Sequence, residues 1–122
     1  TTLCPTAVDP NSTAALDKMR PGLALYAGFF PRYNKLIARH GFASEAAAIA
    51  AKWAAGDKEG AAAEVTDAMV KATSVAGSPE ECRSKLQAYR DSGIDEPIIS
   101  PFARGPQSAA VFEEAIRACA PR

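Results

Sequence analysis

The stretch TSVAGSPEECRSKLQAYRDSGIDEPIIS, residues 73–100, decides the fold class of this chain. Its first four residues form a short β-branched, apolar run, which predicts a strand. Ser78 then gives a strong helix start, because a proline follows it and two acidic residues occupy the first turn, where the helix dipole favours negative charge. Gly93 ends that helix, and residues 94–100 predict a second strand. Strands that are joined through a helix run parallel.

The segments on either side extend this alternation. Residues 1–8 predict another short strand, which the turn at residues 9–11 ends. A last helix is expected over residues 107–119. Between the first strand and residue 73 the apolar spacing and the capping residues predict four helices; they begin near Ser12, Pro31, Ala46 and Asp57, and the fourth has Val65, Met69 and Val70 on its apolar side. The last helix is expected to bury Val111, Phe112, Ala115 and Ile116.

The predicted strands are too few for a closed structure. Three short strands cannot close a barrel, and an open sheet of three would expose two unpaired edges. With 122 residues the chain also has less than half of the roughly 250 residues of a (β/α)₈ barrel. We therefore expect residues 1–122 to be a single incomplete domain from the C-terminal part of a larger α/β protein. The strands near Val75 and Ile98 are expected to be neighbours in its sheet.

The amino-acid composition and the cysteine pattern restrict the expected partners and cellular location of the protein. Lys plus Arg and Asp plus Glu both number 14, so the net charge is zero and neither nucleic acid nor a membrane surface is an expected partner. Alanine, at 27 residues, favours helices. No apolar run reaches about 18 residues, and the N-terminus shows no signal-peptide pattern. The three cysteines form no C-x-x-C pair, which indicates free thiols in a cytoplasmic protein. Cys82 and Cys119 fall on apolar helix faces and should be reduced and poorly reactive.

Most familiar catalytic motifs are missing. His40 is the only imidazole, and a histidine before a glycine that ends a helix more often contacts the last helix carbonyls than acts in catalysis. One histidine and scattered acids give no metal cluster, so no metal is expected. The turn at Gly77 and Ser78 could present amide groups to a phosphate, although a plain N-cap is the more common use.

Two segments concentrate side chains that suit a ligand. Residues 26–34 are rich in aromatics and also carry Arg32 and Tyr33, which would suit a flat heteroaromatic ligand. A helix corner that packs its own aromatics explains this segment equally well. Residues 100–106 follow a predicted strand, and there Phe102 and Arg104 are candidates for contacts with an anionic ligand, against the alternative of a solvated loop.

The order of these segments resembles the C-terminal stretch of the luciferase-like monooxygenase family. The resemblance rests on residues 75–83, on Leu86 and Tyr89, and on the step from Ser92 through Asp95 to Pro97. The earlier pairs Tyr33-Asn34, Gly41-Phe42 and Gly56-Asp57, with Leu36 and residues 65–67, resemble the helical region of the same family. The resemblance implies the C-terminal part of a TIM-type (β/α)₈ barrel, mostly helical here, with two or three short parallel strands.

The family also implies a chemistry. Its members use FMN or the deazaflavin coenzyme F-420, so the resemblance implies an oxidoreductase, here closest to the F-420-dependent enzymes that exchange a hydride with a small organic substrate. The loop that holds the cofactor phosphate and most catalytic residues of the family would lie upstream of residue 1, so no catalytic residue is assigned. Arg32, Tyr33, Phe102 and Arg104 are the candidates for cofactor or substrate binding.

The resemblance further implies a partner for the exposed sheet. That partner would be the remaining N-terminal part of the barrel or a second copy of the chain, and this piece alone should be inactive. The alternative from another class of function is a non-enzymatic, alanine-rich helical module that binds a protein.

Overall fold

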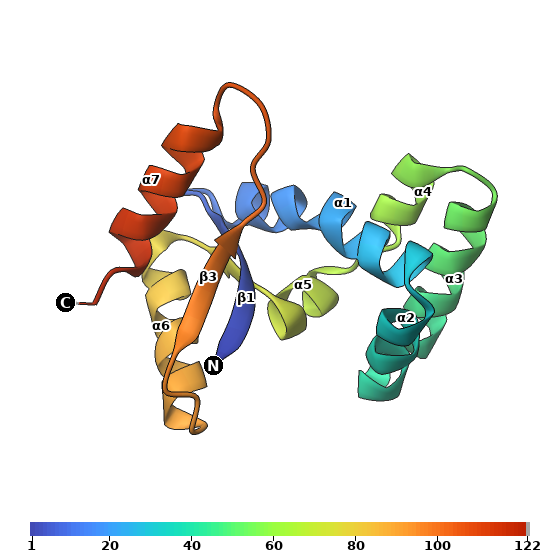
Figure 1. The fold of residues 1–122 in the computed structure, drawn as a ribbon. Coiled ribbons are helices and arrows are strands. Elements are labelled where there is room, and N and C mark those ends of the chain that lie inside the picture. Colours follow the sequence, from blue (N-terminus) through green and yellow to red (C-terminus); the bar gives the residue numbers. More distant parts are fainter. Residues whose placement is uncertain (122) are drawn as a thin grey trace. The chain divides into compact units, whose positions relative to one another are not determined.

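The computed structural model describes residues 1–121 and divides into two compact units (Figure 1). Unit 1 contains Thr1–Met19 and the chain from Thr73 onward, and unit 2 contains Arg20–Ala72. Helix α1 (Ser12–Phe29) begins in unit 1 and continues into unit 2. The expectation of a single incomplete domain stays a prediction.

Unit 1 is built on a sheet of three parallel strands. These are β1 (Thr2–Val8), β2 (Val75–Gly77) and β3 (Pro97–Pro101). The parallel strands confirm the expected α/β class. The expectation that the strands near Val75 and Ile98 are neighbours is wrong, because the order is β2-β1-β3. A physical reason is strand length: β1 offers β3 a ladder of five residue pairs, whereas β2 has only three residues to pair.

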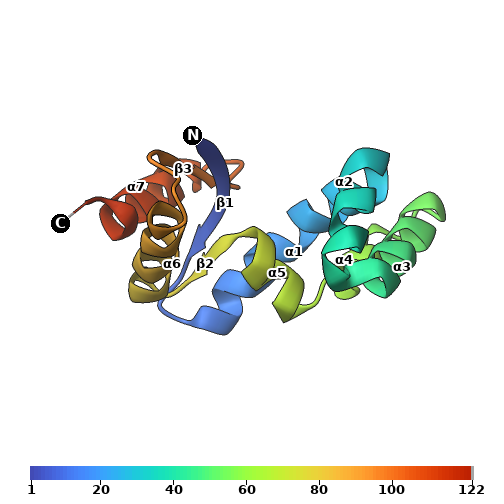
Figure 2. The ribbon, with the colours of Figure 1, turned by 90° about the horizontal axis from the view of Figure 1, so that it is seen from below.

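Two helices cover one face of this sheet. They are α6 (Pro79–Asp91) and α7 (Ser108–Cys119), which contact each other and the strands, and both views show them on the same side (Figures 1 and 2). The core between the sheet and these helices consists of buried side chains from β1, β2 and both helices: Cys4, Val8, Val75, Cys82, Leu86, Ala115, Ala118 and Cys119.

The opposite face of the sheet is exposed around Leu3 and Ile98. Leu3 and Ile98 are register partners on β1 and β3, and they are 65% and 46% exposed. Ile99 packs against the helix-covered core, so Ile98 must point the other way, because successive side chains of a strand alternate. Within residues 1–121 no further strand pairs with β2 or β3. Part of an apolar face is therefore exposed, although Ala7 on the same side of β1 is buried, and two strand edges have no strand paired with them among these residues.

Helix α7 buries only part of the predicted face. Ala115 is buried as expected, and Val111 is half-buried. Phe112 and Ile116 are 43% and 59% exposed, so the expectation that they are buried is wrong. The buried residues are Ala115, Ala118 and Cys119. Positions 115, 118 and 119 are neighbours on one helix face, and their small side chains allow α7 to approach α6 closely. Phe112 and Ile116 were expected to be buried because they are large and apolar, but they lie on the exposed side of the helix.

Unit 2 is entirely helical. After α1 it contains α2 (Pro31–Ile37), a turn η1 (Ala38–Phe42), α3 (Ala43–Ala54), α4 (Lys58–Ala63) and α5 (Asp67–Thr73). The single helix predicted from Asp57 is interrupted at residues 64–66, because Thr66 starts a new one by accepting a hydrogen bond from the Met69 amide at 3.2 Å. Of the helices in the described part of the chain, none combines the length and apolarity needed to cross a membrane.

Helices α1 and α3 approach each other closely in unit 2. A Cβ atom at Gly28 of α1 would lie 2.6 Å from Cγ of Trp53 on α3, so only glycine fits there. Asn34 of α2 reinforces the contact. Its side-chain amide donates hydrogen bonds of 2.8 Å to the carbonyl oxygens of both Ala27 and Ala46. This bridge gives Asn34, the last residue of the aromatic segment 26–34, a structural role that the sequence pattern did not reveal.

Candidate functional site

The carboxyl ends of the three strands meet at one edge of the unit 1 sheet. Asp9 follows β1, Ser78 follows β2 and Phe102 follows β3. The backbone leaves the sheet there because Pro10 and Pro101 lack an amide hydrogen and Gly77 has a φ of 149°. In α/β proteins ligands bind at this edge. It is therefore the candidate site of unit 1.

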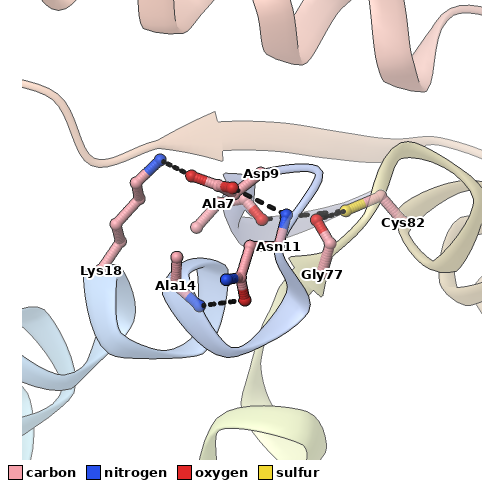
Figure 3. Close-up of polar contacts among 7 residues, drawn as sticks. All are labelled: Ala7, Asp9, Asn11, Ala14, Lys18, Gly77 and Cys82. Atoms are coloured by element: carbon pink, nitrogen blue, oxygen red, sulfur yellow. Dashed lines mark hydrogen bonds and ion pairs between the residues drawn. The ribbon is translucent and has the colours of Figure 1, made fainter.

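Asp9 organises the part of this edge that follows β1 (Figure 3). Its carboxylate accepts hydrogen bonds from the Asn11 amide at 2.8 Å and from Lys18 Nζ at 2.7 Å. The Lys18 hydrogen bond, helped by the Asn11 amide, lowers the pKa of Asp9. Asn11 in turn caps α1 by accepting a hydrogen bond from the Ala14 amide at 3.2 Å. Asp9 thus stays ionised and fixes the start of α1.

Sequence reasoning had treated Asp9 only as part of a turn and had not selected Lys18. An acidic residue directly after a strand was the available signal for Asp9. The contact with Lys18, nine residues away, depends on how α1 leaves the strand.

The start of α6 forms a reciprocal cap. Ser78 Oγ accepts a hydrogen bond from the Glu81 amide at 3.3 Å, and Glu81 Oε2 accepts one from the Ser78 amide at 2.7 Å. Ser12 Oγ also donates to Glu81 Oε2, at 2.5 Å. The carboxylate of Glu81 therefore occupies the position where the helix dipole would favour a phosphate. The turn at Gly77 and Ser78 could have bound a phosphate or capped the helix, and the structure shows the N-cap.

The loop after β3 carries two of the four predicted site residues. Phe102 is 42% exposed, and Arg104 is exposed two residues further on. The loop is constrained at its far end, because Gly105 has a φ of 85° and its carbonyl oxygen accepts a 2.8 Å hydrogen bond from Ser108 Oγ. The loop that carries both residues leaves the carboxyl end of β3 and leads to α7 (Figure 1). An exposed ring and an exposed guanidinium group therefore belong to one loop next to the candidate edge. Their role as ligand contacts stays a prediction.

The other two predicted residues lie in unit 2. Arg32 and Tyr33 are exposed on α2, and Tyr33 packs edge-on against Tyr26 with 5.0 Å between ring centroids. Phe30 lies 5.6 Å from Tyr26 and 4.9 Å from Phe29. These aromatics pack against one another at the junction of α1 and α2, as the corner interpretation expected, while Tyr33 keeps 49% of its surface exposed. The predicted residues thus form two pairs, one in each unit.

The remaining candidates give no further site. His40 is exposed in η1. Among residues 1–121, no group of three His, Cys, Asp or Glu side chains could hold a metal ion. The three cysteines are all free and buried, which confirms the prediction of free thiols.

Comparison with known proteins places this geometry in a family. A profile of the luciferase-like monooxygenases matches residues 1–96. The chain also superposes on the structure of coenzyme F420 dependent tetrahydromethanopterin reductase from Methanopyrus kandleri, with a TM-score of 0.78 and 21% identity. That alignment covers 96% of this chain and 33% of the reductase chain. A search of curated proteins found no significant match.

These similarities account for the fold class of the chain. The structure is a mostly helical α/β fold with three parallel strands. It corresponds to one third of the length of a TIM-barrel reductase, which confirms the expected fold class. The family match includes β1, β2 and α6 and ends just before β3. Because the profile covers most of the sequence, the chain belongs to the luciferase-like monooxygenase family.

Proposed function

We propose that this chain forms the C-terminal part of an F-420-dependent oxidoreductase barrel, in which cofactor and substrate bind at the carboxyl edge of the strands. The observation that carries the proposal is the meeting of three strand ends at one edge, next to a loop with an exposed ring and an exposed guanidinium group. Barrel enzymes bind their substrates at this edge. Membership of the luciferase-like family supports redox chemistry there.

The residues of the β3 loop suit the anionic tail or the ring margin of such a cofactor, whereas the start of α6 does not suit its phosphate. Both FMN and coenzyme F-420 combine a flat ring system with an anionic tail. Arg104 supplies a cation and Phe102 an apolar ring, so the β3 loop suits the tail or the ring margin. The start of α6 does not suit the phosphate while Glu81 occupies it. When bound, the cofactor would supply hydride transfer, and residues of this chain would hold and orient it.

We further propose a partner for the open face of the unit 1 sheet. Leu3 and Ile98 expose adjacent apolar side chains there, and the outer edges of β2 and β3 have no further strand among the described residues. Such edges are normally paired or covered. The N-terminal part of the same barrel is the occupant we favour, and a second copy of the chain is the alternative. Sedimentation of the isolated 12.8 kDa chain as a clean monomer would count against both.

The proposal is tested by titrating the protein that carries this sequence with coenzyme F-420 and with FMN, followed by absorbance or fluorescence. Arg104→Ala should weaken binding of the cofactor or an anionic substrate by about 1.5–3 kcal/mol, the range for hydrogen bonds to charged groups. This equals roughly 10- to 150-fold in Kd. Arg104→Lys should recover only part of the loss, because an ammonium group cannot form the bidentate contact.

A matched control is available on the neighbouring helix. Arg117 of α7 is exposed and pairs with Glu113, so Arg117→Ala should leave both affinities unchanged. If Arg104→Ala behaves like this control, the β3 loop is only a connection. If neither cofactor binds, the proposal fails, and the alternative of a protein-binding helical module gains support from the exposed Phe29 and Leu36 of unit 2.

A further inference from the structure

Unit 2 exposes a cluster of large apolar side chains where α1 ends and α2 begins. We call it the apolar patch; it consists of Phe29, Phe30, Tyr33 and Leu36, which keep between 39% and 60% of their surface exposed. The ring centroid of Phe30 lies 4.9 Å from that of Phe29 and 6.0 Å from that of Tyr33, so the three rings form one continuous surface. Leu36 follows Tyr33 by one helical turn and extends this surface along α2. Contiguous exposed apolar side chains mark interaction sites, whereas single scattered ones do not.

The apolar patch is held in a fixed arrangement. Tyr26 packs against two of its rings, with centroid distances of 5.0 Å to Tyr33 and 5.6 Å to Phe30. Asn34, next to Tyr33, ties α2 to α1 and α3 through its two hydrogen bonds to backbone carbonyl oxygens. A surface that is already ordered loses little conformational entropy when a partner binds to it.

A row of three exposed cations lies beside the apolar patch. Arg32 and Lys35 belong to α2, and Arg39 follows in η1, before the backbone leaves the helical conformation at the next residue. Residues three and four apart are neighbours on a helix, so the three cations form one row next to Leu36. No ion pair in the described part of the chain includes any of them. Because residues 18–44 contain no acidic residue, this surface is locally positive in a chain without net charge.

Charge and area decide which occupant suits this surface. If two copies met through the same patch, their rows of cations would face each other, and like charges in contact are unfavourable. Three cations supply few of the phosphate contacts on which nucleic-acid affinity depends. Four partly exposed side chains offer a bilayer little of the apolar area that membrane binding requires. An acidic protein segment remains, and aromatic side chains together with arginine are typical of protein interfaces.

We propose that the apolar patch and its row of cations are the docking surface for an acidic segment of a partner protein, in which Asp or Glu residues stand next to large apolar ones. The apolar side chains of that segment would cover Phe29 and Leu36, and its carboxylates would pair with the cations. Arg32 and Tyr33 would then contact a protein, instead of the cofactor or substrate expected from the sequence. This surface does not depend on the cofactor chemistry proposed for unit 1.

The test uses a random-peptide display library, which is depleted on the immobilised Phe29→Ser variant and then selected on the unmodified protein. The surviving peptides therefore need the apolar patch, and we expect them to be enriched in Asp and Glu beside Leu, Phe or Trp. A synthetic peptide from this selection, titrated by fluorescence anisotropy, should bind about tenfold or more weakly to Arg39→Glu and to Lys35→Glu. Its affinity should also fall as the salt concentration rises.

A matched control is available in unit 1. Arg90→Glu reverses an exposed cation of α6 and should leave the Kd of the peptide unchanged. Far-ultraviolet circular dichroism checks that every variant keeps its helix content. Leu36→Ser, at a second exposed position of the apolar patch, replaces Phe29→Ser in the depletion if that variant loses helix.

Selection of peptides without acidic residues, or survival of no peptide after depletion, would overturn the proposal. So would displacement of the bound peptide by coenzyme F-420 or FMN, because the surface would then belong to a cofactor site. Phosphatidylserine vesicles or a single-stranded oligonucleotide that bind more tightly than the selected peptides, and lose this binding in Arg39→Glu, would assign the surface to a membrane or to nucleic acid instead.

Discussion

Replacement of Gly28 by alanine should destabilise unit 2, although alanine is the better helix former. A Cβ atom at this position would lie 2.6 Å from Cγ, 2.7 Å from Cβ and 2.8 Å from Cδ2 of Trp53. All three distances are far below a van der Waals contact. Rotation of the indole cannot relieve them all, because Trp53 Cβ is attached to the backbone of α3.

The expected magnitude follows from two opposing terms. Overpacking of this kind costs about 1–3 kcal/mol, and occasionally more. Alanine in place of glycine in a helix returns about 1 kcal/mol. Because the clash includes an atom that cannot rotate away, we take the upper part of the first range. The net loss in the free energy of unfolding should then be about 1–2 kcal/mol.

Urea unfolding followed by far-ultraviolet circular dichroism measures this loss, and Trp53→Gly, which also removes the Cβ atom of residue 53, provides the matched background. Trp53 is the only tryptophan, so fluorescence would lose its signal in that variant. Without a side chain at residue 53 the clash is gone, and Gly28→Ala should become neutral or stabilising by up to about 1 kcal/mol. The coupling energy of the double-mutant cycle should therefore favour the double variant by about 2 kcal/mol, within the range for contacting residues.

A higher unfolding midpoint for Gly28→Ala in the presence of Trp53 would refute this reasoning. It would show that α1 and α3 can separate at little cost. Equal effects of the substitution in both backgrounds would refute it as well, because the loss could not then come from the indole.

Three further predictions concern single polar contacts. Ser78→Ala removes the acceptor of the Glu81 amide and should cost about 1 kcal/mol in urea unfolding, whereas Ser78→Asp should keep the cap. Asn34→Asp replaces an amide that donates to two carbonyl oxygens and should cost about 1–3 kcal/mol at neutral pH, with part of the loss recovered in acid. Lys18 lowers the pKa of Asp9 in the folded protein. The stability that this carboxylate contributes is therefore present above its unfolded pKa of about 3.9 and is lost as the pH falls through the lower folded pKa. An NMR titration that gives Asp9 an ordinary midpoint would contradict this.

The sequence by itself determined the local elements of this protein. Ser78 with the following proline predicts the start of α6, Asp57 caps α4 as expected by accepting from the Gly60 amide, and the parallel direction of the strands follows from the helices between them. These features depend on hydrogen bonds within a few residues or on chain connectivity. The order of motifs was enough to suggest the family, which the profile match confirms.

Tertiary structure alone decided how these elements are combined. The central place of β1 depends on which strand offers the longest ladder, which no local pattern encodes. The inward face of α7 depends on the small side chains that α6 accepts, so Phe112 stays exposed although it is large and apolar. The bond from Ser12 to Glu81, 69 residues apart, fills the start of α6 with a carboxylate. Contacts of this kind depend on which elements pack together over long stretches of the chain, and residue spacing does not determine that packing.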